Sequence, residues 1–331
     1  MSDGKIRILK DLHTLLSHNV IGDKQYISRY KGFRGELDFL ALLRSGGMEF
    51  VNGGMFVSRI NRAKPYDRAA YFSVADERTM DSYRSIYRQI SSVGFEKMYL
   101  ATHDSDYENW ERRDVMGFGA ECAVPEFGIY EYDTGTGEFG PVDGNASVIA
   151  DYYRDVEGQR GRNSYDIPVN TRDFHIRQLE NFDREDILDM YTTRLIFDGY
   201  IGFGKIKGIA ADIDVIILKD GNPVLCEVKE KDLSKRPPKG FGMDLHRIDD
   251  ITHFSAETGL PSLYVVRHVD NQIDRKFVEW KMISMEDFCR HTESSRVIEG
   301  GHGMRSEWSR NPTRVCPYRH FGDFDIKGLS N

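Results

Sequence analysis

The sequence predicts a mixed fold of the α/β (α+β) class, with a central mixed β-sheet flanked by helices. Three observations favour this class. The 331 residues are 40% hydrophobic and 30% charged, which is the composition of an ordinary globular protein. Segments with helical spacing of apolar residues alternate with short segments typical of strands. In the second half, the predicted order of helix, strands, helix and strand is that of a sheet covered by helices.

The N-terminal half is predicted to be an α/β region over residues 1–165 that recognises the target or forms a dimer. Its first predicted helix, over residues 35–45, ends at Gly46 and Gly47. The elements expected after it are strands at 48–57 and 69–74, a helix at 76–93, a buried strand at 97–101 and a hairpin around 133–137. The polar stretch 155–170 is the best candidate for a linker.

The second half gives sharper signals, and we expect a catalytic core over residues 166–290. Asp183 is placed to cap a helix with an acidic first turn, which stops at Gly199. The elements expected after this helix are strands at 209–218 and 223–229, a helix at 243–258 and a buried strand at 263–267. The strands enclose Asp220-Gly221, the strongest hairpin signal in the chain. Residues 291–331 form a basic, aromatic C-terminal extension.

Charged residues gather at one end of the predicted hairpin. Side chains of a strand alternate between its faces, so Asp212 and Asp214 share one face, and Glu227 and Lys229 share a face of the partner strand. With Asp-Gly at the centre of the turn, the register places Asp214 opposite Glu227 and Asp212 opposite Lys229. Two carboxylates about 5 Å apart repel each other. A hard divalent cation would offset this repulsion, which favours Mg²⁺, with Mn²⁺ as a substitute.

The pattern assigns a role to each group at this end of the hairpin. Asp214 and Glu227 are candidate metal ligands, and the backbone carbonyl of Val228 is a further one. Lys229 is placed to hold or activate water, or to neutralise a phosphate as charge develops. The alternative is a solvent-exposed hairpin whose charges decorate its wet face. Against it, the opposite face is wholly apolar and the charged face becomes apolar toward the turn, at Ile216, Leu218 and Leu225.

The run Asp212-Ile213-Asp214-Val215-Ile216-Ile217-Leu218, followed by Glu227-Val228-Lys229, resembles the signature of the PD-(D/E)XK nuclease superfamily. This superfamily includes most type II restriction endonucleases. The resemblance covers residues 173–267, although Ile213 stands where the signature has proline. It implies a restriction endonuclease-like αβββαβ core, with Asp214 and Glu227 as metal ligands and Lys229 as the catalytic lysine.

The resemblance also implies an acidic residue from the helix that precedes the hairpin. Glu185 is the candidate, and Glu180 and Asp189 are its rivals. An acidic residue in the first turn of a helix also favours the helix dipole, whatever its part in catalysis. Both interpretations of Glu185 therefore stay open.

Two basic segments are candidates for nucleic-acid contact. The segment after Lys229 leaves the site as a loop and carries Lys231, Lys235, Arg236 and Lys239, which are suited to backbone phosphates. The C-terminal segment carries Arg310, Arg314 and Arg319 among aromatic residues that can stack on bases. The alternatives are a solvated loop and an extension packed on its own domain.

Several classes of protein are disfavoured. The net charge of -8 argues against indiscriminate coating of nucleic acid, although a locally basic cleft remains compatible with it. No apolar run approaches the roughly 18 residues of a membrane span. The N-terminus lacks an apolar signal segment and the four cysteines are scattered, so we expect a reduced, cytoplasmic protein. No zinc or nucleotide-binding spacing is present, and no organic cofactor is expected.

The sequence thus favours an enzyme, a Mg²⁺-dependent DNA endonuclease of the type II restriction kind that hydrolyses phosphodiester bonds. Cutting both strands of a palindromic site in double-stranded DNA requires two active sites related by a two-fold axis, so a homodimer is expected. One alternative keeps the fold and changes the target, to a junction, repair or RNA nuclease. The other is a nucleic-acid-binding module that does not cleave.

Overall fold

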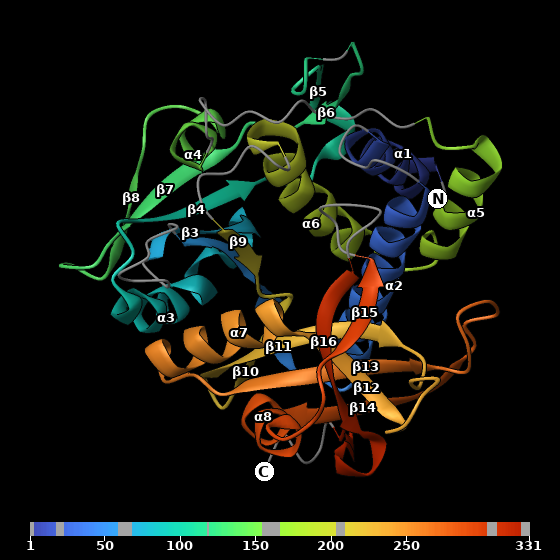
Figure 1. The fold of residues 1–331 in the computed structure, drawn as a ribbon. Coiled ribbons are helices and arrows are strands. Elements are labelled where there is room, and N and C mark those ends of the chain that lie inside the picture. The colour runs from blue at the N-terminus through green and yellow to red at the C-terminus, as the bar shows by residue number, and fades with distance from the viewer. Residues whose placement is uncertain are drawn as a thin grey trace. The chain divides into compact units, whose positions relative to one another are not determined.

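The computed structural model describes residues 3–17, 23–58, 68–117, 119–153, 166–202, 209–302 and 310–325 (Figure 1). The fold is mixed α/β with mixed sheets, as predicted. The chain forms two compact units: unit 1 is Met1–Tyr30 with Gly54–Asp212, and unit 2 is Lys31–Gly53 with Ile213–Asn331. These units do not follow the consecutive ranges 1–165, 166–290 and 291–331. Most of the expected linker at 155–170 lies outside the described residues.

Unit 1 is built on a mixed sheet in which β3 and β4 are parallel and the other neighbours antiparallel. The strand order is β8 (Glu138–Pro141), β7 (Gly128–Asp133), β4 (Lys97–His103), β3 (Arg68–Asp76), β2 (Gly54–Ser58) and β9 (Ile209–Asp212). The α-helices of this unit are α1 (Asp3–Ser17), α3 (Met80–Ile90), α4 (Ser147–Tyr153), α5 (Val169–Leu179) and α6 (Arg184–Arg194). Shorter elements are β5 (Glu111–Arg113), β6 (Cys122–Val124), the 3₁₀ turns Glu77–Thr79, Ser91–Val93 and Tyr107–Asn109, and the π-helix Leu195–Ile201. Asp183 caps α6 as predicted, since its side chain accepts a hydrogen bond from the N–H of Glu185.

Unit 2 is built on another mixed sheet, in which β11 and β13 are parallel. The strand order is β1 (Glu49–Asn52), β10 (Val215–Lys219), β11 (Asn222–Lys231), β13 (Ser262–Val269), β14 (Phe277–Ser284) and β17 (Gly322–Asp323). A smaller antiparallel sheet has the order β12 (Gly240–Asp244), β16 (Arg310–Pro317) and β15 (Ile298–His302). The helices are α7 (Leu245–Thr258), α8 (Met285–Thr292) and the 3₁₀ turn Tyr318–His320. Helix α2 (Asp23–Ser45) begins in unit 1 and ends in unit 2.

The predicted hairpin of unit 2 is present in the predicted register. Val215 pairs with Cys226, and Lys219 pairs with Asn222. Asp220 has φ 50 and Gly221 has φ 76, and both residues therefore adopt the left-handed backbone that a two-residue hairpin turn needs. The turn fixes which residues of the two strands lie opposite each other.

Two predicted strands are each divided between the units. The strand expected at 209–218 is β9, which ends in unit 1, followed by β10 in unit 2. Asp212 pairs with Met55, so its predicted position opposite Lys229 is wrong. The strand expected at 48–57 divides at Gly53, where an added Cβ would overlap the carbonyl oxygen of Ile213. The apolar patterns run through both breaks, and periodicity therefore gives no sign of them.

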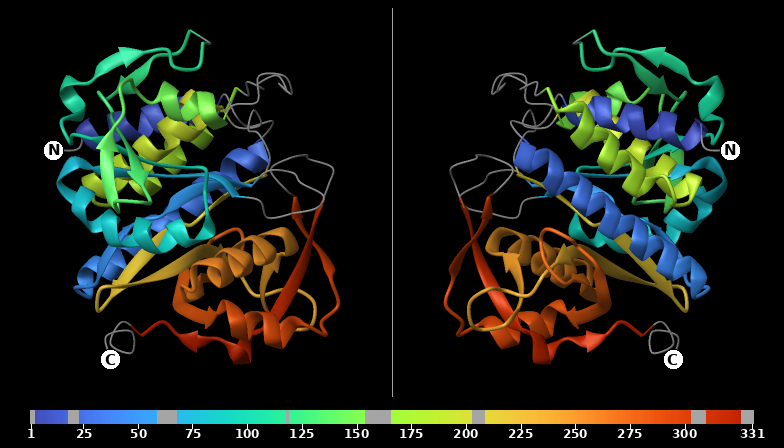
Figure 2. Two further views of the ribbon diagram at one scale, coloured as in Figure 1. Left: turned by 90° about the vertical axis from the view of Figure 1, so that its left-hand side faces the viewer. Right: turned by 90° about the vertical axis from the view of Figure 1, so that its right-hand side faces the viewer.

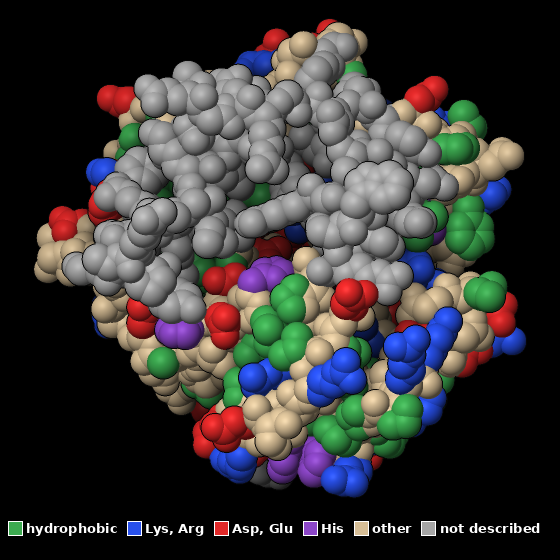
Figure 3. Space-filling model, in the orientation of Figure 1, with side chains coloured by type: hydrophobic (Ala, Val, Ile, Leu, Met, Phe, Trp, Pro, Cys, Tyr) green, Lys and Arg blue, Asp and Glu red, His purple; other side chains and the backbone are tan. Residues whose placement is uncertain are grey.

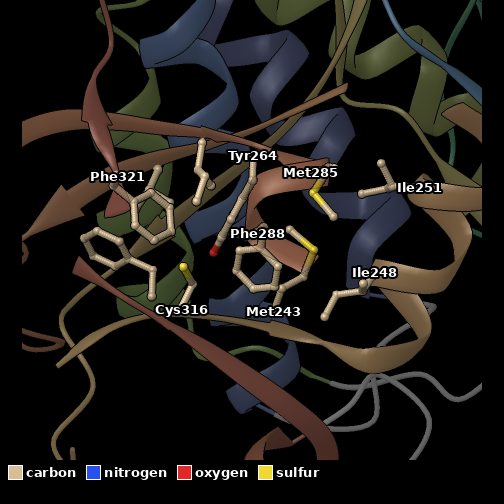
Figure 4. Packing of buried hydrophobic residues seen from close by; sticks show 11 residues of the cluster. Met243, Ile248, Ile251, Tyr264, Met285, Phe288, Cys316 and Phe321 are labelled. Atoms are coloured by element: carbon tan, nitrogen blue, oxygen red, sulfur yellow. The ribbon is translucent and has the colours of Figure 1, made fainter. Parts of the chain in front are cut away.

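The sheet of unit 2 is covered on both faces. On one face, Phe39 and Leu43 of α2 pack with Val215, Val224 and Cys226 of the hairpin. On the other face, side chains from β12, α7, β13, α8 and β16 form a core around Tyr264 and Phe288 (Figure 4). Strands β15 and β16, which pair antiparallel, form a long ribbon that is drawn in orange-red to red in Figure 2. A hairpin buried on both faces is not the solvent-exposed hairpin of the alternative interpretation.

Two further expectations can be compared with the described residues. Among them, no helix combines the length and the apolar content that a membrane crossing requires. The four cysteines all lie in the described part of the chain and are free thiols. Burial raises the pKa of the Cys122 thiol to about 11 and that of the Cys316 thiol to about 12. Raised pKa values of this kind are typical of inert structural cysteines.

Candidate active site

Asp214, Glu227 and Lys229 come together at the open end of the hairpin, as predicted. Nζ of Lys229 lies 2.8 Å from Oε1 of Glu227 and 3.2 Å from Oδ2 of Asp214. The side chains of Asp214 and Glu227 are 3% and 1% exposed, whereas that of Lys229 is 36% exposed. One ammonium group therefore bridges two buried carboxylates and is itself accessible to solvent.

The backbone fixes Asp214 from two directions. The N–H of Val228 donates a hydrogen bond of 2.7 Å to Oδ2 of Asp214. The N–H of Gly53 donates a hydrogen bond of 3.2 Å to the carbonyl oxygen of Asp214. In an extended strand, the N–H and C=O of one residue point to the same side. The carbonyl of Val228 therefore points toward the side of the strand on which Asp214 lies.

Arg247, in the first turn of α7, belongs to the same cluster. Nη2 of Arg247 forms an ion pair with Oε2 of Glu227, and the arginine side chain is 11% exposed. The sequence pattern does not point to this residue, because spacing along the chain does not reveal that α7 begins beside β11. Two buried carboxylates are thus matched by two cationic side chains.

Lys231 lies in β11 and not in the loop that the sequence predicted. It lies two residues from Lys229 and four from Glu227 along one strand, so the three side chains share a face. Burial lowers the pKa of Lys231, and the negative charge of Asp244, at the start of α7, acts in the opposite direction. Lys231 therefore extends the row of charges along β11 toward α7.

The helix acid that the resemblance implied belongs to unit 1, whereas this cluster belongs to unit 2. Glu185 lies in α6 of unit 1, where its carboxylate is 3.4 Å from Nη2 of Arg78, and its catalytic role stays a prediction. In unit 2, helix α2 packs on the face of the sheet that carries Val224 and Cys226, which is opposite to the face of Glu227 and Lys229. Within the described ranges, no three Asp, Glu, His or Cys side chains form a group that could hold a metal ion. The acidic groups of this cluster are thus the pair Asp214 and Glu227.

The two predicted basic segments lie side by side. The N–H of Tyr318 donates a hydrogen bond of 2.9 Å to the carbonyl oxygen of Lys239, and Gly240 pairs with Pro317. The connection from β11 to β12 exposes Lys235, Arg236 and Lys239, and the adjacent 3₁₀ turn exposes Arg319. In Figure 3, Lys and Arg side chains (blue) gather over β12 and β16. Arg314 lies within β16 and is half-buried, and the side chain of Arg310 is outside the described part of the chain.

The donor set of the cluster defines the chemistry it can support. The carboxylates of Asp214 and Glu227 and the carbonyl of Val228 are oxygen ligands, the kind that Mg²⁺ and other hard cations prefer. Lys229 adds a partly exposed ammonium group suited to an anionic oxygen. Comparisons of the chain with models of protein families, with curated proteins and with solved structures find no match. Any functional conclusion therefore depends on the geometry.

Proposed function

We propose that this chain is a Mg²⁺-dependent DNA endonuclease with a restriction endonuclease-like core. The observation that carries the proposal is the position of the Lys229 ammonium, 2.8 Å from the Glu227 carboxylate and 3.2 Å from that of Asp214. Burial of charged groups is costly, and buried charges in proteins are usually paired or bind metals. A buried group of charges adds little to stability, whereas catalytic sites often need one. We therefore explain this cluster as a reaction centre and not as a stabilising feature.

The chain order of unit 2 supports the proposal. Its elements α2, β1, β10, β11, α7 and β13 follow one another as helix, three strands, helix and strand, with β12 before α7. This is the αβββαβ order that the resemblance implies. The first strand, β1, pairs with β10 although residues 54–212 separate them in the chain. The proposed core thus begins earlier in the chain than residue 166, the start expected from the sequence.

The residues present fit a divalent cation. Asp214, Glu227 and the Val228 carbonyl would hold Mg²⁺, which binds through one or two carboxylates and keeps several waters. When bound, this ion would polarise the scissile phosphate and lower the pKa of a bound water. Asp214 is oriented for this role by the N–H of Val228, and Glu227 is oriented by Arg247.

Lys229 has a separate role in the proposed reaction. Its ammonium group is held by both carboxylates and is about one-third exposed, so a phosphate oxygen can reach it from solvent. A positive charge fixed at this position stabilises the negative charge that builds on the phosphate as water attacks. It also positions the attacking water by donating a hydrogen bond.

Double-stranded DNA is the proposed substrate, and a homodimer is the proposed assembly. The exposed Lys235, Arg236, Lys239 and Arg319 would contact backbone phosphates, which supply most sequence-independent affinity. Unit 1 would recognise the target or form the dimer contact. Two copies related by a two-fold axis would cut both strands of a palindromic site.

Incubation of the protein with plasmid DNA and Mg²⁺ tests the proposal. Discrete fragments are expected, together with loss of all cleavage when EDTA is added. Glu227→Gln and Lys229→Met should each remove cleavage and keep duplex affinity, because phosphate contacts elsewhere supply that affinity. Glu286→Gln is the matched control, since Glu286 forms an exposed ion pair on α8 of the same unit and should leave cleavage unchanged.

The same experiment separates the related activities. Cuts confined to branched DNA would identify a junction or repair nuclease, and cleavage of RNA alone would identify a ribonuclease. A mobility shift without cleavage of any of these substrates would contradict the proposal and favour a binding module. Full cleavage by both the Glu227→Gln and the Lys229→Met variants would overturn the assigned roles.

A further inference from the structure

Among the residues that the structure describes, the two carboxylates of the candidate active site are paired with two cationic side chains. Asp214 and Glu227 carry two negative charges, and Lys229 and Arg247 carry two positive charges within ion-pair distance of them. Each oxygen of Glu227 faces a different cation, since Oε1 lies near Lys229 and Oε2 lies near Arg247. A divalent ion that enters this cluster therefore adds two positive charges beside two cations that already pair with the carboxylates.

Arg247 and Lys229 differ in how strongly they oppose such an ion. The side chain of Arg247 is 11% exposed, whereas that of Lys229 is 36% exposed. Solvent screens a buried charge weakly, so the guanidinium repels a nearby cation more strongly than the ammonium does. Arg247 therefore competes with a metal ion for the carboxylate of Glu227.

We propose that Arg247 prevents tight binding of a divalent cation to the free protein, so that the cation and an anionic phosphate bind together. This inference rests on the metal site of the proposed function. A phosphodiester brings one negative charge to the cluster and offsets part of the charge that the ion adds. Because coupling between two ligands is reciprocal, the phosphate raises the affinity for the ion and the ion raises the affinity for the phosphate. The free protein then holds little metal and is poised for a DNA complex.

Titration of the free protein with Mn²⁺, followed by the electron paramagnetic resonance of unbound Mn²⁺, tests the role of Arg247. We expect weak binding to the unaltered protein and binding at least about tenfold tighter to Arg247→Gln, which removes the charge and keeps a hydrogen-bonding side chain. Asp214→Asn in the Arg247→Gln background should abolish the gain, which places the bound ion in this cluster. Equal or weaker Mn²⁺ binding by Arg247→Gln would overturn the proposal, because Arg247 would then only orient Glu227.

Two further variants separate charge from structure. Arg247→Lys keeps the positive charge and should bind Mn²⁺ as weakly as the unaltered protein. Arg290→Gln removes an exposed arginine of α8 that pairs with Glu286 and Asp287, and it should leave Mn²⁺ affinity unchanged. A gain in affinity for Arg247→Lys or Arg290→Gln would contradict the charge-based explanation. Circular dichroism and thermal unfolding confirm that each variant is folded.

A measurement on the unaltered protein keeps the proposal testable even if Arg247→Gln does not fold. Fluorescence anisotropy gives the affinity for a labelled duplex with and without Ca²⁺, and reciprocity predicts tighter duplex binding with the ion. Unchanged affinity would overturn the coupling. The Mn²⁺ titration does not depend on cleavage. If plasmid cleavage is absent while Arg247→Gln still tightens Mn²⁺ binding, the proposed function fails and the role of Arg247 stands.

Discussion

The side chain of Asp214 accepts a hydrogen bond of 2.7 Å from the backbone N–H of Val228. Strand β10 begins at Val215, one residue later, so the carboxylate bonds to β11 just beyond the point where the β-ladder starts. Asp214 is therefore held by the main chain of the strand that carries Glu227 and Lys229. The same residue has a structural role and a proposed chemical role, and substitution can separate the two.

Asp214→Asn and Asp214→Ala are expected to have different stabilities, although both should lose activity. Asparagine keeps an oxygen that accepts the hydrogen bond from Val228, whereas alanine leaves a buried N–H without its partner, which costs about 1–3 kcal/mol. Both variants lose the charge and should lose plasmid cleavage. Urea unfolding and cleavage assays measure the two effects. Equal stability of the two variants would show that the hydrogen bond contributes nothing.

Glu227 and Arg247 are expected to be strongly coupled in stability. Glu227→Gln removes the negative charge with which the nearly buried guanidinium of Arg247 forms an ion pair, and such changes typically cost about 3–5 kcal/mol. The double variant Glu227→Gln/Arg247→Gln removes both charges and should recover part of that loss. A double-mutant cycle from urea unfolding measures the coupling free energy. Strictly additive effects would show that the ion pair is energetically unimportant.

Gly53→Ala is expected to destabilise the fold by several kcal/mol. A Cβ at this position would overlap the carbonyl oxygen of Ile213, and two main chains cannot separate without loss of the hydrogen bond from Gly53 to Asp214. Gly140→Ala is the matched control, because Gly140 lies in β8 and a Cβ there meets nothing within 4 Å. Thermal unfolding compares the two variants. Similar melting temperatures would refute the close approach at Gly53.

His103 is expected to make stability pH-dependent. Burial opposes its protonated form, but Asp189 and the carbonyl of Asp104 stabilise that form, and the pKa of His103 is raised. Stability from this group is fully present below about pH 6.5, the pKa of an unperturbed histidine, and is lost as pH rises through the raised value. Urea unfolding between pH 6 and 9 should show this decline. Asp189→Asn should flatten it, and an unchanged slope in that variant would contradict the assignment.

Local signals in the sequence were sufficient for the hairpin. The left-handed conformation of Asp220 and Gly221 follows from the residue types, and it sets the register that brings Asp214, Glu227 and Lys229 together. The cap of α6 at Asp183 and the end of α7 at Gly259 follow from equally local rules. Where neighbours in the chain determine structure, the predictions agree with it.

Pairing between strands that are far apart in the chain cannot be predicted from the sequence, for a physical reason. Nothing within β1 specifies that it pairs with β10, because any apolar strand offers similar hydrogen-bonding groups. The same limit applies to Arg247, whose contact with Glu227 depends on where α7 starts in space. The predicted domain ranges were consecutive because composition marks candidate linkers, whereas the two units are interleaved along the chain.

The hydrogen bond between Gly53 and Asp214 has a consequence for the design of shortened chains. It joins the two points at which the path of unit 2 is interrupted, so the ends left by excision of residues 54–212 already meet. A tight turn could therefore link residues 31–53 directly to residues 213–331 without stretching either end. Residues 54–212 thus form a long insertion in unit 2, and the two ends of unit 2 between which they are inserted are already joined by a hydrogen bond.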